Sequence, residues 1–168
     1  MSEERLRSYA VLLLRLALGT MFVAHSIIYM TMTLTLAGTV AFFASLGLPP
    51  WFAYATIIAE ALGGLLLILG IQTRWVALAL SPILVGAVWA HSGNGWLFAS
   101  PDGGWEYPLY LFVLCIAQAM LGDGAYAPQL LARGPAAWGI VFGRKPFEGA
   151  PTRVAPAAYP ARPPSATA

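Results

Sequence analysis

The sequence predicts an all-α membrane protein in which four transmembrane helices form an antiparallel bundle. Of the 168 residues, 59% are hydrophobic and only 10% are charged, and the mean hydropathy is +0.72. A soluble domain carries about 25% charged residues, so this chain has too few charges to cover a surface in water. It also contains four apolar stretches suited to crossing a bilayer, and its basic residues fall on one side of them.

The predicted spans follow one another along the chain, each near the roughly 20 residues that a helix needs to cross the hydrocarbon core. They cover residues 9–30, 51–71, 75–93 and 107–121, the last being short and beginning at the interface. Between the first two, residues 33–50 are apolar but rich in Gly, Ser and Thr, and end in a proline pair. We interpret this stretch as an amphipathic or re-entrant segment that lies on the membrane or folds against the bundle.

Charge asymmetry predicts the orientation. Arg74 occupies the tight turn between the second and third spans, whereas the loop before the fourth span carries Asp102 and Glu106. The other basic residues outside the spans precede the first span or follow the last: Arg5, Arg7, Arg133, Arg144, Lys145, Arg153 and Arg162. Because basic residues are retained in the cytoplasm, we expect a multi-pass protein of a bacterial-type cytoplasmic (inner) membrane with both termini cytoplasmic.

The chain divides into three predicted parts. Residues 1–8 form a cytoplasmic N-terminus, residues 9–126 the four-helix domain, and residues 127–168 a juxtamembrane segment with a Pro/Ala-rich cytoplasmic tail. Such a tail buries too little apolar surface to order itself, so we predict that it is disordered apart from residues 138–142, an apolar stretch suited to the headgroup level.

Composition also excludes several kinds of function. A net charge of +2 gives no reason to expect a nucleic-acid partner. A single cysteine, Cys115, excludes an intramolecular disulfide, a CxxC redox pair and a cysteine zinc site. The chain is therefore not a thiol-exchange enzyme that acts alone.

Two charged residues lie deep inside the predicted spans. Arg15 lies about 10 Å in from the start of the first span, and Glu60 lies near the middle of the second. A charge at that depth is costly, so each residue is the obvious partner of the other. One interpretation is structural: the pair fixes helix packing, or the Arg15 side chain extends to the cytoplasmic interface instead. The other interpretation is a site for a proton or an anionic substrate. Gly63 and Gly64 beside Glu60 offer a small-residue face for close helix packing.

A second polar group is expected near the outer surface. His25 and His91 take matching positions in two spans that run in the same direction, and Glu106 and Tyr107 enter at that level. Two histidines and a carboxylate suit a proton relay, a quinone headgroup or a transition metal. The alternative is histidines that merely bond to loops. Since no motif such as HExxH supports a metal, ligation by His25, His91 and Glu106 is the least favoured interpretation.

Four segments in this order resemble the DoxX family of small four-helix membrane proteins: "LLLRLALGTMFVAHS", "FFASLGLPP", "AEALGGLLLILGIQTR" and "GGWEYPLYLFVL…LGDGAY". The resemblance covers residues 12–126. The recurring polar and glycine positions of the family correspond here to Arg15, His25, Glu60, Gly63, Gly64, Thr73, Arg74, His91, Glu106 and Tyr107.

The chain departs from the family pattern at three places. After His25, the usual glycine and nearby basic residue are absent, and Ser26, Ile28 and Tyr29 stand there instead. A Gly-Pro-Gly near the end of the domain appears as residues 122–124, Gly-Asp-Gly, and Gln129 stands where an aspartate is expected.

The resemblance implies a redox association. DoxX relatives are linked to quinone-dependent oxidation of sulfur compounds and to membrane complexes that handle thiols or oxidative stress. Because the chain has no haem, flavin or cysteine-pair motif, we expect no intrinsic cofactor and a membrane subunit of an oxidoreductase rather than an enzyme alone. Such a subunit has protein partners and offers a quinone or proton site. The alternatives are a small-molecule carrier and a purely structural or assembly subunit; a carrier moves its substrate alone in liposomes, whereas a redox subunit copurifies with a cofactor-bearing partner.

Overall fold

The first helix is long and changes its hydrogen-bonding pattern part of the way along. In the computed structural model, which describes residues 2–127, α1 spans Glu3–Val23 and runs directly into a π-helix, η1, at Ala24–Thr33. The helix begins before the predicted residue 9, because Glu3 and Glu4 place negative charge at the positive end of the helix dipole.

A short helix follows. α2 spans Thr35–Ser45 and packs against both η1 and α3. Residues 33–50 therefore fold against neighbouring helices, one of the two placements predicted for them. The chain enters α2 through Thr35, whose φ of 68° makes a sharp change of direction at the end of η1.

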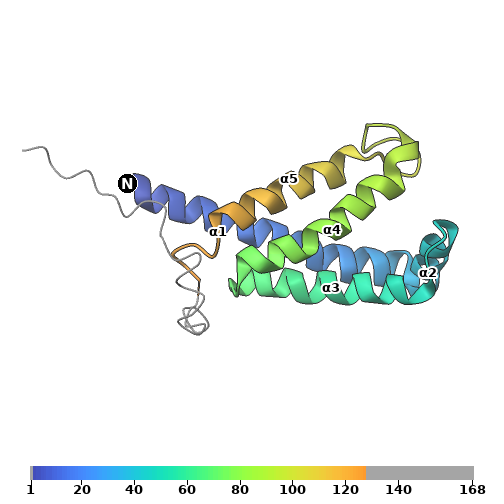
Figure 1. Cartoon of the computed structure of the whole chain (residues 1–168), viewed down its shortest axis with the longest axis horizontal. Coiled ribbons are helices and arrows are strands. Elements are labelled where there is room, and N and C mark those ends of the chain that lie inside the picture. The colour runs from blue at the N-terminus through green and yellow to red at the C-terminus, as the bar shows by residue number, and fades with distance from the viewer. Residues whose placement is uncertain (1, 128–168) are drawn as a thin grey trace, which may run out of the picture. The chain divides into compact units, whose positions relative to one another are not determined.

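Three further helices complete the domain. α3 spans Pro50–Leu69, begins with proline in its first turn and ends at Gly70, whose φ of 76° suits a left-handed helix cap. α4 spans Thr73–His91 and is followed by a short 3₁₀ helix, η2, at Ser92–Asn94. α5 spans Glu106–Leu121, close to its predicted bounds. Figure 1 shows the long helices side by side, and contacts join α1 to α3 and α5, and α4 to α3 and α5.

The all-helical prediction is confirmed for residues 2–127, in which the structure contains no strand. Among the described residues, three helices are long and apolar enough to cross a membrane: Glu3–Thr33, Pro50–Leu69 and Thr73–Asn94. α5 is apolar as well, but its 16 residues fall short of that length. The remaining predictions for the tail, including residues 138–142 and Gln129, lie outside the described residues.

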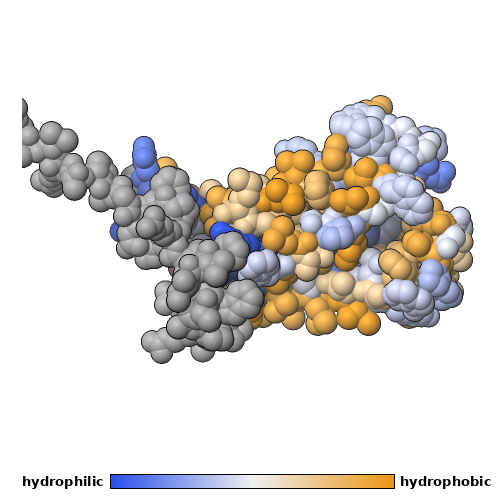
Figure 2. Space-filling model, viewed as in Figure 1, coloured by the Kyte–Doolittle hydropathy of each residue, from blue (hydrophilic) through white to orange (hydrophobic). Residues whose placement is uncertain are grey.

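The apolar side chains of these helices lie largely on the outside. At most 33% of the apolar window of any of the three long helices is buried. Leu13, Met32 and Tyr110 are each about two thirds exposed or more. Figure 2 shows hydrophobic surface along the middle of the helices and more hydrophilic surface towards their ends. A surface of this kind suits contact with lipid.

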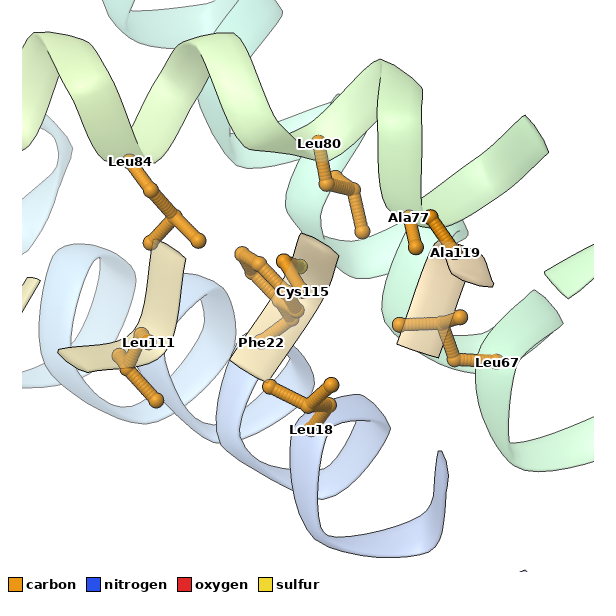
Figure 3. Close-up of a cluster of buried hydrophobic side chains, with 9 residues drawn as sticks. All are labelled: Leu18, Phe22, Leu67, Ala77, Leu80, Leu84, Leu111, Cys115 and Ala119. Carbon is orange, nitrogen blue, oxygen red and sulfur yellow. The ribbon is translucent and has the colours of Figure 1, made fainter. Parts of the chain in front are cut away.

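A compact core nevertheless holds the long helices together. It draws side chains from α1, α3, α4 and α5, so each long helix contributes to one shared cluster (Figure 3). The cluster consists of Leu18, Phe22, Leu67, Ala77, Leu80, Leu84, Leu111, Cys115 and Ala119. Cys115 is fully buried there and behaves as a small apolar residue.

Glycines set the distance between helices. A Cβ at Gly19 would lie 2.7 Å from the Gly64 carbonyl oxygen, so α1 and α3 touch backbone to backbone. Gly63 faces the other way, where a Cβ would lie 2.8 Å from the side chain of Leu80 in α4. The predicted small-residue face of α3 thus contacts two different helices.

Candidate functional site

Glu60 and His25 form the polar contact between α1–η1 and α3. His25 Nδ1 lies 2.8 Å from Glu60 Oε2, which joins the two side chains by a hydrogen bond. The Glu60 side chain is only 4% exposed, whereas that of His25 is 43% exposed. One member of the pair is therefore buried between helices, and the other presents part of its ring to the surroundings.

The register between α1 and α3 explains this partnership. Gly19 in α1 packs on Gly64 and Ile68 in α3. His25, six residues after Gly19, meets Glu60, four residues before Gly64. As residue numbers rise along α1, those of the contacting residues in α3 fall. Glu60 is therefore carried to the level of His25.

The backbone around His25 is unusual. His25 lies in the first turn of η1, where a π-helix widens the helix, and π-helical turns are frequent at functional sites. Hydroxyl groups bond to carbonyls that this geometry leaves accessible: Thr31 Oγ1 donates to Ser26 O at 2.8 Å, and Thr39 Oγ1 in α2 donates to Met30 O at 2.6 Å. The Tyr29 ring stacks on His25, with centroids 5.3 Å apart and 18° between the planes.

This arrangement controls the chemistry of the imidazole. A neutral ring that donates Nδ1–H to the Glu60 carboxylate carries its lone pair on Nε2, the nitrogen that the hydrogen bond to Glu60 does not use. A protonated ring instead offers Nε2–H as a donor, with the positive charge balanced by Glu60. A buried carboxylate that accepts a hydrogen bond from one ring nitrogen fixes the tautomer and the orientation of a histidine. The pair can therefore accept and return a proton at the helix surface.

The predicted pairing of Arg15 with Glu60 is wrong. Both residues are buried, each with 3% exposure, but Arg15 Nη1 donates to the main-chain oxygen of Asp123 at 2.9 Å. Arg15 Nη2 lies 3.5 Å from the main-chain oxygen of Tyr126. Since Arg15 precedes His25 by ten residues, or about 15 Å of helix, it lies beside Gly70 at the end of α3 and not beside Glu60.

Asp123 organises that end of the domain, and the sequence reasoning did not identify it as a site residue. Its Oδ1 accepts hydrogen bonds from Thr73 N at 2.6 Å and Thr73 Oγ1 at 2.7 Å, which caps the start of α4. Arg74 Nε donates to Ala119 O at 3.0 Å and satisfies a carbonyl at the end of α5. An acidic residue between two glycines, just after the last apolar helix, was the available signal.

Two tyrosines hold the turn after α5 against α1. The rings of Tyr9 and Tyr126 stack with centroids 5.3 Å apart and 20° between the planes. A side-chain hydrogen bond from the same contact raises the pKa of Tyr126 above its ordinary value.

The predicted outer cluster is not one site. His25 is bonded to Glu60, whereas His91 Nδ1 lies 3.2 Å from the main-chain oxygens of Asp102 and Gly103. The loop before α5 thus satisfies His91, which was the alternative interpretation of the histidines. Glu106 and Tyr107 line a separate groove that neither histidine lines. Within residues 2–127, no three His, Cys, Asp or Glu side chains gather as a metal site requires, so the structure does not support ligation by His25, His91 and Glu106.

Comparisons with known proteins found a family model and a curated relative that each match part of the chain. The sequence model of the DoxX family matches residues 10–93, a range that contains Arg15, His25, Glu60 and His91. Over 77 residues, the chain is 36% identical to a protein of Bacillus subtilis (strain 168) named "Putative oxidoreductase CatD". The match covers 46% of this chain and 55% of that protein, so the chain spans about half the length of its curated relative. No solved structure matches.

Proposed function

Because the chain belongs to the DoxX family, we propose that it is an integral membrane subunit of a redox complex, in which the His25–Glu60 pair exchanges protons with a quinone or quinol. The observation that carries this proposal is the 2.8 Å contact between a buried carboxylate and a histidine whose ring is partly exposed. The name of the Bacillus subtilis relative supports an oxidoreductase association.

The surroundings of His25 suit an apolar ligand with a polar head. Ile28 is 57% exposed and Met32 70% exposed, so an apolar surface extends along η1 from the histidine. A quinone tail can lie on that surface while its head reaches the ring. His25 Nε2 then takes a proton from a quinol hydroxyl, and Glu60 stabilises the imidazolium that forms.

The electrons need a separate acceptor. Oxidation of a quinol releases two electrons and two protons; the electrons pass to a redox cofactor on a partner protein, and the protons leave one after the other through Nε2. The proposed subunit therefore acts within a complex and supplies the quinone contact and the proton path.

The proposed membrane arrangement is an antiparallel bundle of four spans in a bacterial-type inner membrane, with α5 as the fourth span and both termini cytoplasmic. Contacts at both ends of α4 and α5 support it: Thr73 meets Asp123, and Trp96, just after η2, accepts a hydrogen bond from the backbone of Glu106. In the same way, the contacting residues of α1 and α3 run in opposite order.

The proposal is tested in the native complex, isolated in a mild detergent with its partners. We would measure quinol oxidation and quinone affinity for His25→Gln and Glu60→Gln, with His91→Gln as the matched control, since the His91 ring is hydrogen-bonded to loop carbonyls and not to a carboxylate in the part of the chain that the structure describes. Loss of an acid–base group predicts a fall of about 100-fold in the rate for the first two variants and none for the control. Wild-type rates in both His25→Gln and Glu60→Gln, with an intact complex, would refute the proposed role of the pair.

A further inference from the structure

A groove at the start of α5 lies apart from the His25–Glu60 pair. Its volume is ≈ 520 Å³, within the range of pockets that hold small organic ligands. Four aromatic residues line it, Trp96 and Phe98 from the loop before α5 and Tyr107 and Tyr110 from the helix itself, together with the carboxylate-bearing Glu106.

The groove is held open by a well-connected loop. Trp105 N donates to Gly95 O at 3.2 Å, and Glu106 N donates to Trp96 O at 3.1 Å, so the loop closes on the beginning of α5. The rings of Trp96 and Trp105 meet edge to face with centroids 4.4 Å apart, which fixes Trp96 in place. The rings of Phe98 and Tyr107, which also line the groove, lie with their centroids 5.4 Å apart.

The negative charge of Glu106 has no cationic partner in the described part of the chain. Within residues 2–127, the Glu106 carboxylate takes part in no hydrogen bond or ion pair. The buried or partly buried arginines are too far away to pair with Glu106. Arg15 and Arg74 bond to carbonyls in and after the last turn of α5. The first of these acceptors, Ala119, lies about 20 Å along the helix from Glu106. A carboxylate without a partner beside aromatic rings offers a place for a cationic group.

The remaining walls are apolar and exposed. Tyr110 is 67% exposed and Val113 56% exposed, so the groove continues for about 10 Å along the outer side of α5 from Glu106. Aromatic faces attract cations, and quaternary ammonium groups are bound by aromatic cages with a nearby carboxylate. The walls beyond Glu106 fit an alkyl chain.

We propose that this groove binds a cationic amphiphile, an alkylammonium compound whose head contacts Glu106 and the aromatic rings while its chain lies along α5. A zwitterionic phospholipid is not the proposed occupant, because its phosphate would bring a second negative charge close to Glu106. The site is independent of the proposed quinone chemistry.

Equilibrium dialysis of the full chain in nanodiscs tests this assignment, with empty nanodiscs subtracted. The probes share one chain length: octyltrimethylammonium, neutral octanol and zwitterionic octylphosphocholine. We expect wild-type protein to bind the ammonium compound at least about tenfold more tightly than the other two. The substitution Glu106→Gln should remove that preference, whereas Asp102→Asn, which removes a carboxylate from the same loop outside the groove, should keep it.

Equal binding of the three probes by wild-type protein would overturn the proposal, as would an unchanged ammonium preference in Glu106→Gln. If Glu106→Gln does not fold, Tyr110→Leu provides the test, because Tyr110 is exposed and its ring does not belong to the core. That variant should lose several-fold in affinity for the ammonium compound and none for octanol. Full ammonium affinity in Tyr110→Leu would exclude the aromatic contact.

Discussion

The Arg15 guanidinium lies directly against Gly70, in the space that the Cβ of any other residue would occupy. Gly70 also has a φ of 76°, which disfavours other residue types. We therefore expect Gly70→Ala to destabilise the protein by about 2 kcal/mol or more, from backbone strain and displacement of the arginine. Gly86→Ala in α4 is the control, because a Cβ there meets nothing within 4 Å and helix propensity favours alanine. Denaturant unfolding in detergent measures both; equal stabilities would contradict the contact.

The Asp123 carboxylate should stabilise the domain through Thr73. Its Oδ1 accepts two short hydrogen bonds from that residue, so Asp123→Ala and Thr73→Val should each destabilise by about 1–3 kcal/mol. The double variant should lose less than the sum, because the bond from the Thr73 hydroxyl to Asp123 is lost in both single variants. Strict additivity in the unfolding free energies would show that this bond contributes little.

Double-mutant cycles distinguish the two partnerships considered for Glu60. His25→Leu and Glu60→Leu should couple by about 1–3 kcal/mol, since the side chains are in direct contact. Arg15→Leu and Glu60→Leu should be additive to within about 0.5 kcal/mol, because they share no partner. The reverse pattern, with strong coupling to Arg15, would restore the partnership predicted from the sequence.

Close packing of α1 on α3 should be sensitive to a single methyl group. A Cβ at Gly19 would press on the backbone oxygen of Gly64, which cannot move aside as a side chain can. Gly19→Ala should therefore cost about 1–3 kcal/mol in unfolding free energy. Gly38→Ala in α2 serves as the control, since the nearest atom there would be 3.6 Å away, an ordinary contact. A tolerated Gly19→Ala would mean that the two helices are further apart.

Topology can be tested by labelling single cysteines in a Cys115→Ala background. Position 5 precedes the first predicted span and position 102 lies in the loop before α5, so reagents should reach them from opposite sides of the membrane. Labelling of both from the same side would contradict the four-span arrangement. Cys115 is fully buried, and its replacement by alanine leaves a small void with a cost of about 1 kcal/mol.

Hydropathy was sufficient to predict the three long apolar helices, because a helix that crosses lipid needs a minimum length and an apolar composition. The second half of the first helix was harder to predict, since nothing in a local pattern distinguishes the π-helical Ala24–Thr33 from an ordinary α-helix. The small residues beside Glu60 were correctly identified as positions of close approach, but the sequence could not say which helix each one meets.

The partner of Glu60 could not be predicted from depth alone. Counting residues from the ends of two antiparallel spans placed Arg15 and Glu60 at depths that differ by only a few ångströms, on the assumption that both spans reach the same two membrane surfaces. The actual register depends on the contact of Gly19 with Gly64, a tertiary relationship, and it brings His25 to Glu60. Asp123 was missed for a similar reason, because its role depends on the chain folding back towards Thr73 after α5.

The acceptors of Arg15 are main-chain oxygens, and this gives the arginine an unusual evolutionary freedom. Every residue type has a carbonyl, proline included, so a proline at position 123, as in the Gly-Pro-Gly of the family pattern, still offers an acceptor there. Substitution at 123 removes the carboxylate that Thr73 uses but not the oxygen that Arg15 uses. The sequence of this turn can therefore drift while the buried charge keeps its ligands, provided that the glycines on either side, both with φ of 74°, preserve the path of the backbone.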